Sequence, residues 1–285
     1  MTEPPVDPGS GMSERNIKLT VAYDGTDFLG WQLQKKGRTV QGVMQEGLGR
    51  MHGHPVHVLA AGRTDSGVHA TGQVANFHTD IDSIPPEKFR DAVNSYLPRD
   101  VRVLASEEVE PRFHARKSAR LRVYRYYIVN GPVLLPHLRN YRHWVRRLLD
   151  LKRLNEMASV LVGQHDFSCF CAEGDANVSK VRQVTESSFH VEGDTLIYTI
   201  AASSFLWKMV RTVIGTFLML EEQGLGAPEL LRIMQSGLRS NAGGTAPARG
   251  LFLERVLYEE VNGIPAGSLE GAEPRPGLRE LGVLP

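Results

Sequence analysis

The order of hydrophobic patterns along this chain constrains its fold more than any other feature. Residues 17–23 alternate between hydrophobic and polar, as in a strand, and apolar positions between 40 and 51 keep a helical spacing. Thr39 can cap that helix. Further segments are expected as strands at 57–61, 73–78 and 101–104, and as a helix at 86–96. This order, strand–helix–strand–strand–helix–strand, is the ferredoxin-like pattern.

The second half of the chain repeats the same rhythm. Strands are expected at 123–129, 181–190, 195–202 and 251–258, and helices at 151–162, 206–223 and 228–235. The sequence therefore predicts an α+β fold made of two ferredoxin-like subdomains. We expect their antiparallel sheets to join into one larger sheet, with the helices packed on the outside and a central active-site cleft.

The pattern also divides the chain. We expect a disordered tail at 1–14, an N-terminal subdomain with the catalytic loop at 15–110, and a C-terminal subdomain at 111–261. Residues 262–285 are rich in Pro, Gly and Glu and are expected to form a flexible tail.

Composition places the chain among soluble proteins. Of the 285 residues, 41% are hydrophobic and 23% are charged, which is ordinary for a globular protein. The N-terminus has no secretory or transit signal, and the most apolar helical run, 213–220, is too short to cross a bilayer. Two cysteines cannot form a disulfide framework. These features predict a cytoplasmic protein without membrane contact.

The distribution of charge says more than the net charge of +1. Two clusters of basic residues contain Arg112, Arg116, Lys117, Arg120, Arg122 and Arg125, and then Arg139, Arg142, Arg146, Arg147, Lys152 and Arg153. Aromatic residues are interleaved with both, among them Tyr124 and Tyr126. Basic side chains neutralise phosphates and aromatic rings stack on unpaired bases, so the mixture suits RNA. The alternative is the solvated face of a half-buried strand.

One loop, residues 61–69 (AGRTDSGVH), carries the candidate catalytic carboxylate, Asp65. Gly62 and Gly67 have the spacing of a phosphate-binding loop, but the Lys and Ser/Thr that such a loop needs are missing. The triplet Asp-Ser-Gly resembles that of aspartic proteases, which share one proton between two carboxylates. Arg63 argues against a shared proton, since residues i and i+2 of an extended segment point the same way and can pair. A simple turn-forming aspartate is the remaining alternative.

A metal site is not favoured by the remaining candidates. His52, His54 and His57 lie close together, but their spacing spans a helix end and no acidic ligand completes the set. Cys169 and Cys171 are expected to be small buried residues, because a Cys-x-Cys pair is poorly placed for a disulfide.

Several segments in a fixed order resemble the tRNA pseudouridine synthase A family. They are YDGT at 23–26, GWQ at 30–32, TVQ at 39–41, the loop at 61–70, FHAR at 113–116, YRY at 124–126, HDF at 165–167, FLWKMVR at 205–211 and APARGL at 246–251. The likeness spans about residues 17–259. It departs at Ser66, where the family more often has Ala, and at 178–183, which leaves the role of that loop open.

The resemblance implies a reaction and its partners. Similar enzymes isomerise uridine to pseudouridine at positions 38, 39 and 40 of the tRNA anticodon stem-loop, breaking the N1–C1′ bond and rejoining the uracil through C5. They need no cofactor or metal, and they are homodimers that lay one tRNA across both subunits.

The resemblance also implies residue roles. Asp65 attacks C1′ or C6, or takes the 2′-proton, and these three roles remain open. Arg63 is expected to hold the phosphate of the flipped nucleotide. Tyr124 is expected to stack on the uracil and to accept the C5 proton. Arg211 is expected to pair with Asp65, and Leu206 to wall the pocket with its neighbour Phe205. The competing hypotheses are a non-catalytic RNA-binding protein on the same fold and a dimeric aspartic protease.

Overall fold

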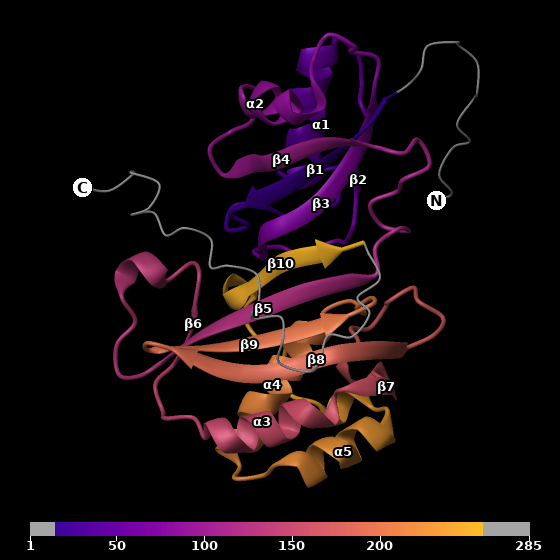
Figure 1. Cartoon of the computed structure of the whole chain (residues 1–285). Coiled ribbons are helices and arrows are strands. Elements are labelled where there is room, and N and C mark those ends of the chain that lie inside the picture. Colours follow the sequence, from indigo (N-terminus) through magenta and orange to yellow (C-terminus); the bar gives the residue numbers. More distant parts are fainter. Residues whose placement is uncertain (1–14, 259–285) are drawn as a thin grey trace.

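The computed structural model describes residues 15–258, and the expected tails at 1–14 and 262–285 lie outside them. These residues form one open mixed sheet of ten strands with helices around it (Figure 1). The strand order is β4-β1-β3-β10-β5-β9-β8-β7, while β2 pairs with β3 and β6 pairs with β5. The predicted α+β class is confirmed.

The first half of the sheet has the ferredoxin-like order. Its strands are β1 (Arg15–Tyr23), β2 (Leu59–Ala60), β3 (His69–Thr79) and β4 (Val101–Val109), and its helices are α1 (Val40–His52) and α2 (Phe89–Asn94). The antiparallel order β4-β1-β3-β2 results. As the periodicity predicts, Ile17, Leu19 and Val21 are fully buried on one face of β1. Thr39 caps α1, since its hydroxyl accepts a hydrogen bond from the backbone N–H of Gly42.

The second half has the same order. Its strands are β5 (Leu121–Asn130), β6 (His143–Val145), β7 (Gly163–Asp166), β8 (Val181–Glu192), β9 (Thr195–Ala202) and β10 (Leu251–Leu257). Its helices are α3 (Leu151–Val160), α4 (Met209–Glu222) and α5 (Ala227–Ser236). The order β10-β5-β9-β8 matches that of the first half, so the weak repeat in the sequence is a repeat of topology.

The two halves meet where β3 pairs with β10. This pair is parallel, with Phe252 opposite His69 and Leu253 opposite Ala70, whereas the four main strands of each ferredoxin-like unit pair antiparallel. The short strand β6 also pairs in parallel, with β5. The rings of His69 and Phe252 stack across the pair, with centroids 4.6 Å apart. In Figure 1, α1 and α2 lie at one end of the molecule and α3, α4 and α5 at the other, with the strands between them. The junction therefore lies in the middle of the sheet.

The structure differs from the prediction at two predicted elements and adds two short strands. The strand expected at 57–61 is only the two residues of β2, and the short strands β6 and β7 were not predicted. The helix expected from residue 206 begins at Met209, because Lys208 has a left-handed backbone (φ 61°) that ends the preceding loop. Among residues 15–258, no helix is long and apolar enough to cross a membrane.

Candidate active site

The loop between β2 and β3 presents Asp65 on a tight turn. The backbone N–H of Val68 donates to the carbonyl of Asp65 (3.1 Å), and Gly67 has the positive φ of 76° that this turn requires. From the segment after β1, the N–H of Trp31 donates to the carbonyl of Thr64 (3.0 Å). The carbonyl of Phe28 accepts from the hydroxyl of Ser66 (3.1 Å). The loop is thus held on both sides of Asp65.

A glycine lets the two segments approach this closely. A Cβ on Gly25 would lie 2.0 Å from the carbonyl oxygen of Val68, so no larger residue fits there without moving the loop. Under the loop, the hydroxyls of Tyr23 and Thr64 form a buried hydrogen bond of 2.8 Å. The position of Asp65 therefore depends on packing against the end of β1.

The second half of the sheet supplies both hydrogen-bond donors to the Asp65 carboxylate. Nη1 of Arg211 in α4 donates to Oδ2 (3.0 Å), and the indole Nε1 of Trp207 donates to Oδ1 (3.1 Å). The Asp65 side chain is 22% exposed and the Arg211 side chain 15%, so the ion pair is largely shielded but reachable from solvent. Each carboxylate oxygen has one donor and keeps further lone pairs for chemistry.

The guanidinium of Arg211 is fixed by a second contact. Its Nε donates to the carbonyl of Ala246 (2.8 Å), and the N–H of Ala246 donates back to the Arg211 carbonyl (3.0 Å). Two donors of one rigid fork are therefore engaged at once, which a lysine could not reproduce.

Tyr124 lies in β5 and is only 7% exposed. Its hydroxyl lies 3.8 Å from the position that a Cβ on Gly62 would occupy, and its ring meets Phe205 edge-on with centroids 5.0 Å apart. Burial raises the pKa of Tyr124 well above its usual value, and the negative charge of Asp65 adds to the effect. The phenol therefore keeps its proton at neutral pH. Leu206, which follows Phe205, is 4% exposed.

Arg122 ties the segments around the site together from beneath. It is buried, and its guanidinium donates to the carbonyls of Ala61 (2.9 Å), Ser203 (2.6 Å), Arg116 (2.7 Å) and Ala119 (3.1 Å). Burial lowers the pKa of Arg122. This arginine belongs to the first basic cluster of the sequence, yet it is an internal clamp and not a surface group that could meet a phosphate.

The structure brings together three of the predicted site residues, Asp65, Tyr124 and Arg211. The pairing of Arg63 with Asp65 was wrong: the side chain of Arg63 is exposed, makes no ion pair within residues 15–258, and leaves Asp65 to Arg211. Sequence reasoning missed Trp207, although it lies inside the FLWKMVR segment. An aromatic residue just before a helix gave no signal of a hydrogen bond to a loop 142 residues away.

The candidate metal ligands have other partners. The ring nitrogens of His52 contact the Leu48 carbonyl and the Thr79 hydroxyl, each at 2.8 Å, and His54 pairs with Asp80. Across the part of the chain that the structure describes, no three His, Cys, Asp or Glu residues are grouped so that they could hold a metal ion.

Comparison with known proteins identifies the family to which the chain belongs. The sequence model of a family described as tRNA pseudouridine synthase matches residues 19–116 and 157–259. The chain is 46% identical over 253 residues to a protein of Treponema denticola, covering 87% of this chain and 94% of the relative. It is 41% identical over 247 residues to one of Thermoanaerobacter sp. (86% and 100%), and 42% identical over 242 residues to one of Halalkalibacterium halodurans (85% and 92%). All three relatives are named tRNA pseudouridine synthase A. Asp65, Trp207 and Arg211 lie within the segments that the family model matches, and the chain belongs to the tRNA pseudouridine synthase family.

Proposed function

We propose that this chain isomerises uridine to pseudouridine at positions 38, 39 and 40 of the tRNA anticodon stem-loop, with Asp65 as the catalytic carboxylate. One observation carries the proposal: a half-buried carboxylate on a loop of the first half is held by two donors, Trp207 and Arg211, from the second. Family membership supports the reaction class. The held carboxylate supports Asp65 as the group that acts, since catalytic groups need a fixed geometry.

The reaction is an isomerisation and needs no oxidant or reductant. The bond between N1 of uracil and C1′ breaks, the base turns, and a bond forms between C5 and C1′. The hydrogen of C5 leaves as a proton, and N1 gains a proton in the product. Asp65 can attack C1′ or C6, or take the 2′-proton, and each role uses an ionised carboxylate with a free lone pair.

The neighbouring residues suit the remaining tasks. Tyr124 is a neutral phenol, so it can relay the C5 proton by giving up its own, but it does not start as a phenolate. Arg63 is exposed on the Asp65 loop, where a guanidinium could bind the phosphate of a flipped nucleotide. Phe205 supplies apolar surface next to Tyr124, and Leu206, which follows it in the chain, is buried.

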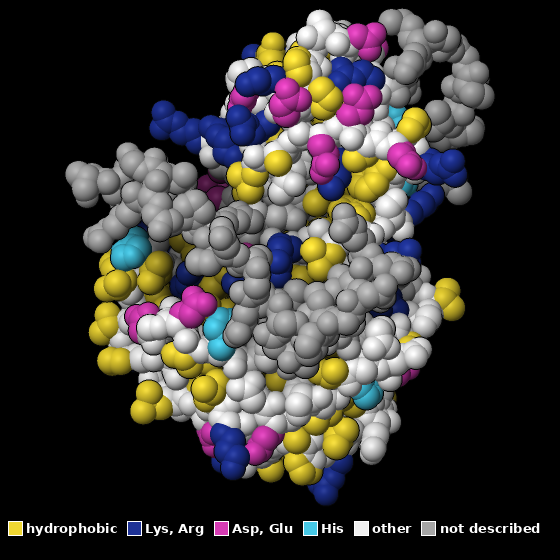
Figure 2. Space-filling model, viewed as in Figure 1, with side chains coloured by type: hydrophobic (Ala, Val, Ile, Leu, Met, Phe, Trp, Pro, Cys, Tyr) yellow, Lys and Arg dark blue, Asp and Glu magenta, His cyan; other side chains and the backbone are white. Residues whose placement is uncertain are grey.

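Exposed basic residues near the clamp of Arg122 suit tRNA binding. Arg116 and Lys117 are exposed, and the backbone of Arg116 is bonded to Arg122, which also holds the start of the Asp65 loop. Phosphates of the tRNA that bind Arg116 and Lys117 would be held at a fixed position relative to the Asp65 loop. Over the face in Figure 2, Lys and Arg side chains lie in small groups among Asp and Glu.

Because Arg116 and Lys117 are exposed cations that could bind phosphates, removing both should weaken tRNA binding and reduce its salt dependence while leaving kcat unchanged.

Tritium release from tRNA tests the proposal, because forming the C1′–C5 bond expels the hydrogen of C5. Transcripts that carry 5-tritiated uridine at only one of positions 38, 39 and 40 should each release tritium with the wild-type protein. Asp65→Asn should lower release by at least about three orders of magnitude while tRNA binding persists. Release from Asp65→Asn close to wild type would refute the role of Asp65. A wild-type protein that binds tRNA and releases no tritium would point to the non-catalytic alternative.

We further propose that the protein is a cytoplasmic homodimer that lays one tRNA across both subunits. Light scattering at micromolar concentration should give twice the mass of one chain, and a saturating tRNA titration should end at one tRNA per two chains. A monomer in both measurements would contradict this part of the proposal without affecting the chemistry.

A further inference from the structure

Trp207 stands out because a large, exposed side chain makes the second hydrogen bond to Asp65. We propose that Trp207 is a positioning residue for the Asp65 carboxylate, and that the loop at 172–180 holds Trp207 in place through Asp175. The inference rests on the proposed role of Asp65. This loop includes part of the 178–183 segment that departs from the family pattern, and its role was left open by the sequence.

The geometry at Asp65 gives Trp207 a task that Arg211 cannot perform alone. A single donor on Oδ2 leaves the carboxylate free to rotate about its Cβ–Cγ bond. The indole N–H on Oδ1, 3.1 Å away, defines the plane of the group. Because attack or proton removal depends on how the oxygens are aimed, fixing this plane favours the reactive geometry.

Exposure alone would make Trp207 mobile, since 47% of it is accessible to solvent. Its backbone, however, is bonded on both sides: its N–H donates to Oδ2 of Asp175 (2.7 Å), and its carbonyl accepts from the N–H of Ala172 (3.0 Å). The next residue, Lys208, is the one non-glycine residue with a positive φ within 15–258. Such a costly conformation persists where surrounding contacts enforce it, and it is common at functional sites.

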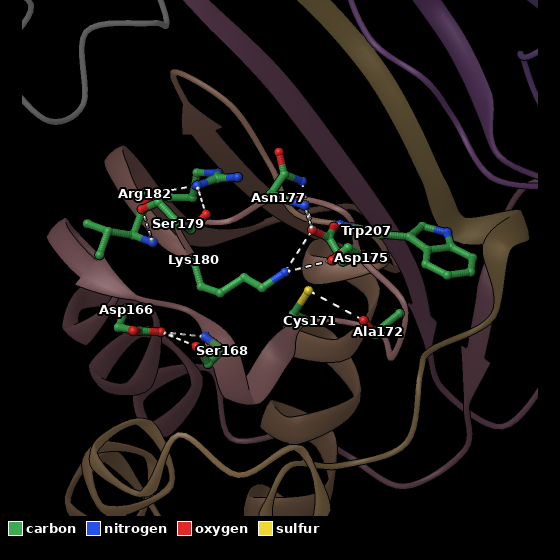
Figure 3. Close-up of polar contacts among 11 residues, drawn as sticks. Asp166, Ser168, Cys171, Ala172, Asp175, Asn177, Ser179, Lys180, Arg182 and Trp207 are labelled. Carbon is green, nitrogen blue, oxygen red and sulfur yellow. Dashed lines mark hydrogen bonds and ion pairs between the residues drawn. The ribbon is translucent and has the colours of Figure 1, made fainter. Parts of the chain in front are cut away.

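Asp175 is the centre of these contacts. Its side chain is 3% exposed, and Oδ1 accepts from Nζ of Lys180 (2.9 Å) and from the backbone N–H and side-chain amide of Asn177 (2.8 Å each). Figure 3 shows the carboxylate between Lys180, Asn177 and the backbone of Trp207, while the indole points away from this group. Burial by itself would raise the pKa of Asp175, but the bonds from Trp207, Lys180 and Asn177 outweigh it and hold the pKa well below its usual value.

A chain of direct contacts therefore runs from Lys180 through Asp175 to the Trp207 backbone, and from the indole to Asp65. A paired, nearly inaccessible carboxylate is a rigid anchor, because breaking it would leave a buried charge without donors. The loop at 172–180 thus acts on the active site without touching the substrate, by fixing the residue that aims the carboxylate.

Single-turnover rates at saturating tRNA test the inference. Trp207→Phe keeps an aromatic ring but removes the indole N–H together with part of the ring, so it should lower the rate about 10- to 100-fold while the Kd for tRNA changes less than about twofold. Trp144→Phe is the matched control, because that indole donates to the carbonyl of Gly131 (2.9 Å) instead.

A double-mutant cycle tests the role of Asp175. Asp175→Ala should lower the rate in the wild-type background and have little further effect in Trp207→Phe, because both changes break one chain of contacts. Asp150→Ala also removes a carboxylate that anchors a backbone N–H, at the start of α3, and controls for general destabilisation. Should Asp175→Ala fail to fold, Asp175→Asn keeps the shape and takes its place in the cycle.

The outcomes separate the two proposals. If Asp65→Asn is inactive while Trp207→Phe reacts at the wild-type rate, the inference about Trp207 fails and the proposed function stands. Additive effects of Trp207→Phe and Asp175→Ala would refute the connection through the loop. If Asp65→Asn keeps wild-type activity, the proposed function itself fails.

Discussion

The carboxylate of Asp65 and the guanidinium of Arg211 form a 3.0 Å ion pair between residues that are 146 positions apart in the chain. Asp65 lies on the loop before β3 and Arg211 in the first turn of α4, so the pair connects the two ferredoxin-like halves. The shared sheet makes this contact possible, because the pairing of β3 with β10 fixes the halves relative to one another. The candidate active site therefore forms only where the two halves of the sheet join.

Arg211→Lys is predicted to lower kcat about 100-fold, even though the charge is kept. A lysine lacks the two separate nitrogens that the planar guanidinium directs to Oδ2 of Asp65 and to the carbonyl of Ala246, so the carboxylate would lose its fixed partner. Single-turnover tritium release measures the effect. Arg232→Lys is the control, since Arg232 pairs with Glu229 on the surface of α5. Equal rates for Arg211→Lys and wild type would contradict the prediction.

Tyr124→Phe is predicted to fold normally and to slow the reaction by about two orders of magnitude or more. The ring keeps its packing against Phe205, and only the hydroxyl that can relay a proton is lost. Tritium release reports the rate, and the melting temperature reports the fold. A Phe variant with full activity would show that Tyr124 serves as a stacking surface alone.

Arg122→Met is predicted to lower the free energy of unfolding by about 2–4 kcal/mol. The change strips the donors from the buried carbonyl of Ala61 and from the carbonyl of Ser203. Urea denaturation measures the loss. Arg90→Met, which breaks only an exposed pair with Asp91, should cost less than about 1 kcal/mol. Similar midpoints for these two variants would show that Arg122 is not a clamp.

Acid is predicted to destabilise the protein partly through His143. Burial, with a smaller effect of Arg249, lowers the pKa of His143 from 6.5 to about 4, and its Nδ1 has no hydrogen-bond partner within residues 15–258. The unfolded chain takes up a proton near pH 6.5 while the folded chain stays neutral, so stability is complete above that pH and falls as the pH drops toward 4. The loss can reach about 1.4 kcal/mol per pH unit.

The comparison of wild type with His143→Phe isolates this effect. Urea denaturation at pH 7.0 and 5.5 should show a smaller fall in the free energy of unfolding for the variant, because the ring that titrates is gone. An equal fall in both proteins would mean that His143 does not contribute.

Hydrophobic periodicity predicted those strands and helices that are long enough to show a period. The alternation of Ile17, Leu19 and Val21 marks β1 because its inner face is buried along its whole length. The strands β6 and β7 have three and four residues, too few for a period to appear. Leu206 fits the apolar spacing of α4, yet the helix starts later because the backbone of Trp207 is bonded to Asp175 and Ala172. Those partners are distant in sequence, so no local pattern reports them.

The same distinction applies to the active site. By itself the sequence determined the α+β class, the repeated order of elements, and the identity of Asp65, Tyr124 and Arg211 as candidate site residues, because periodicity and motif are encoded in neighbouring positions. The resemblance implied that Arg211 pairs with Asp65, whereas local geometry allowed Arg63 as well, and only the tertiary structure decided between them. Residues i and i+2 can meet along an extended segment, which favoured Arg63, but the bend of the loop leaves Arg63 in solvent and presents Asp65 to α4.

The roles of Trp207, Asp175 and Arg122 were likewise decided by the fold. Each depends on hydrogen bonds to groups that lie far away along the chain. Trp207 bonds to Asp65 and Arg122 to Ala61 across the two halves of the sheet, while Asp175 bonds to Trp207 within the second half.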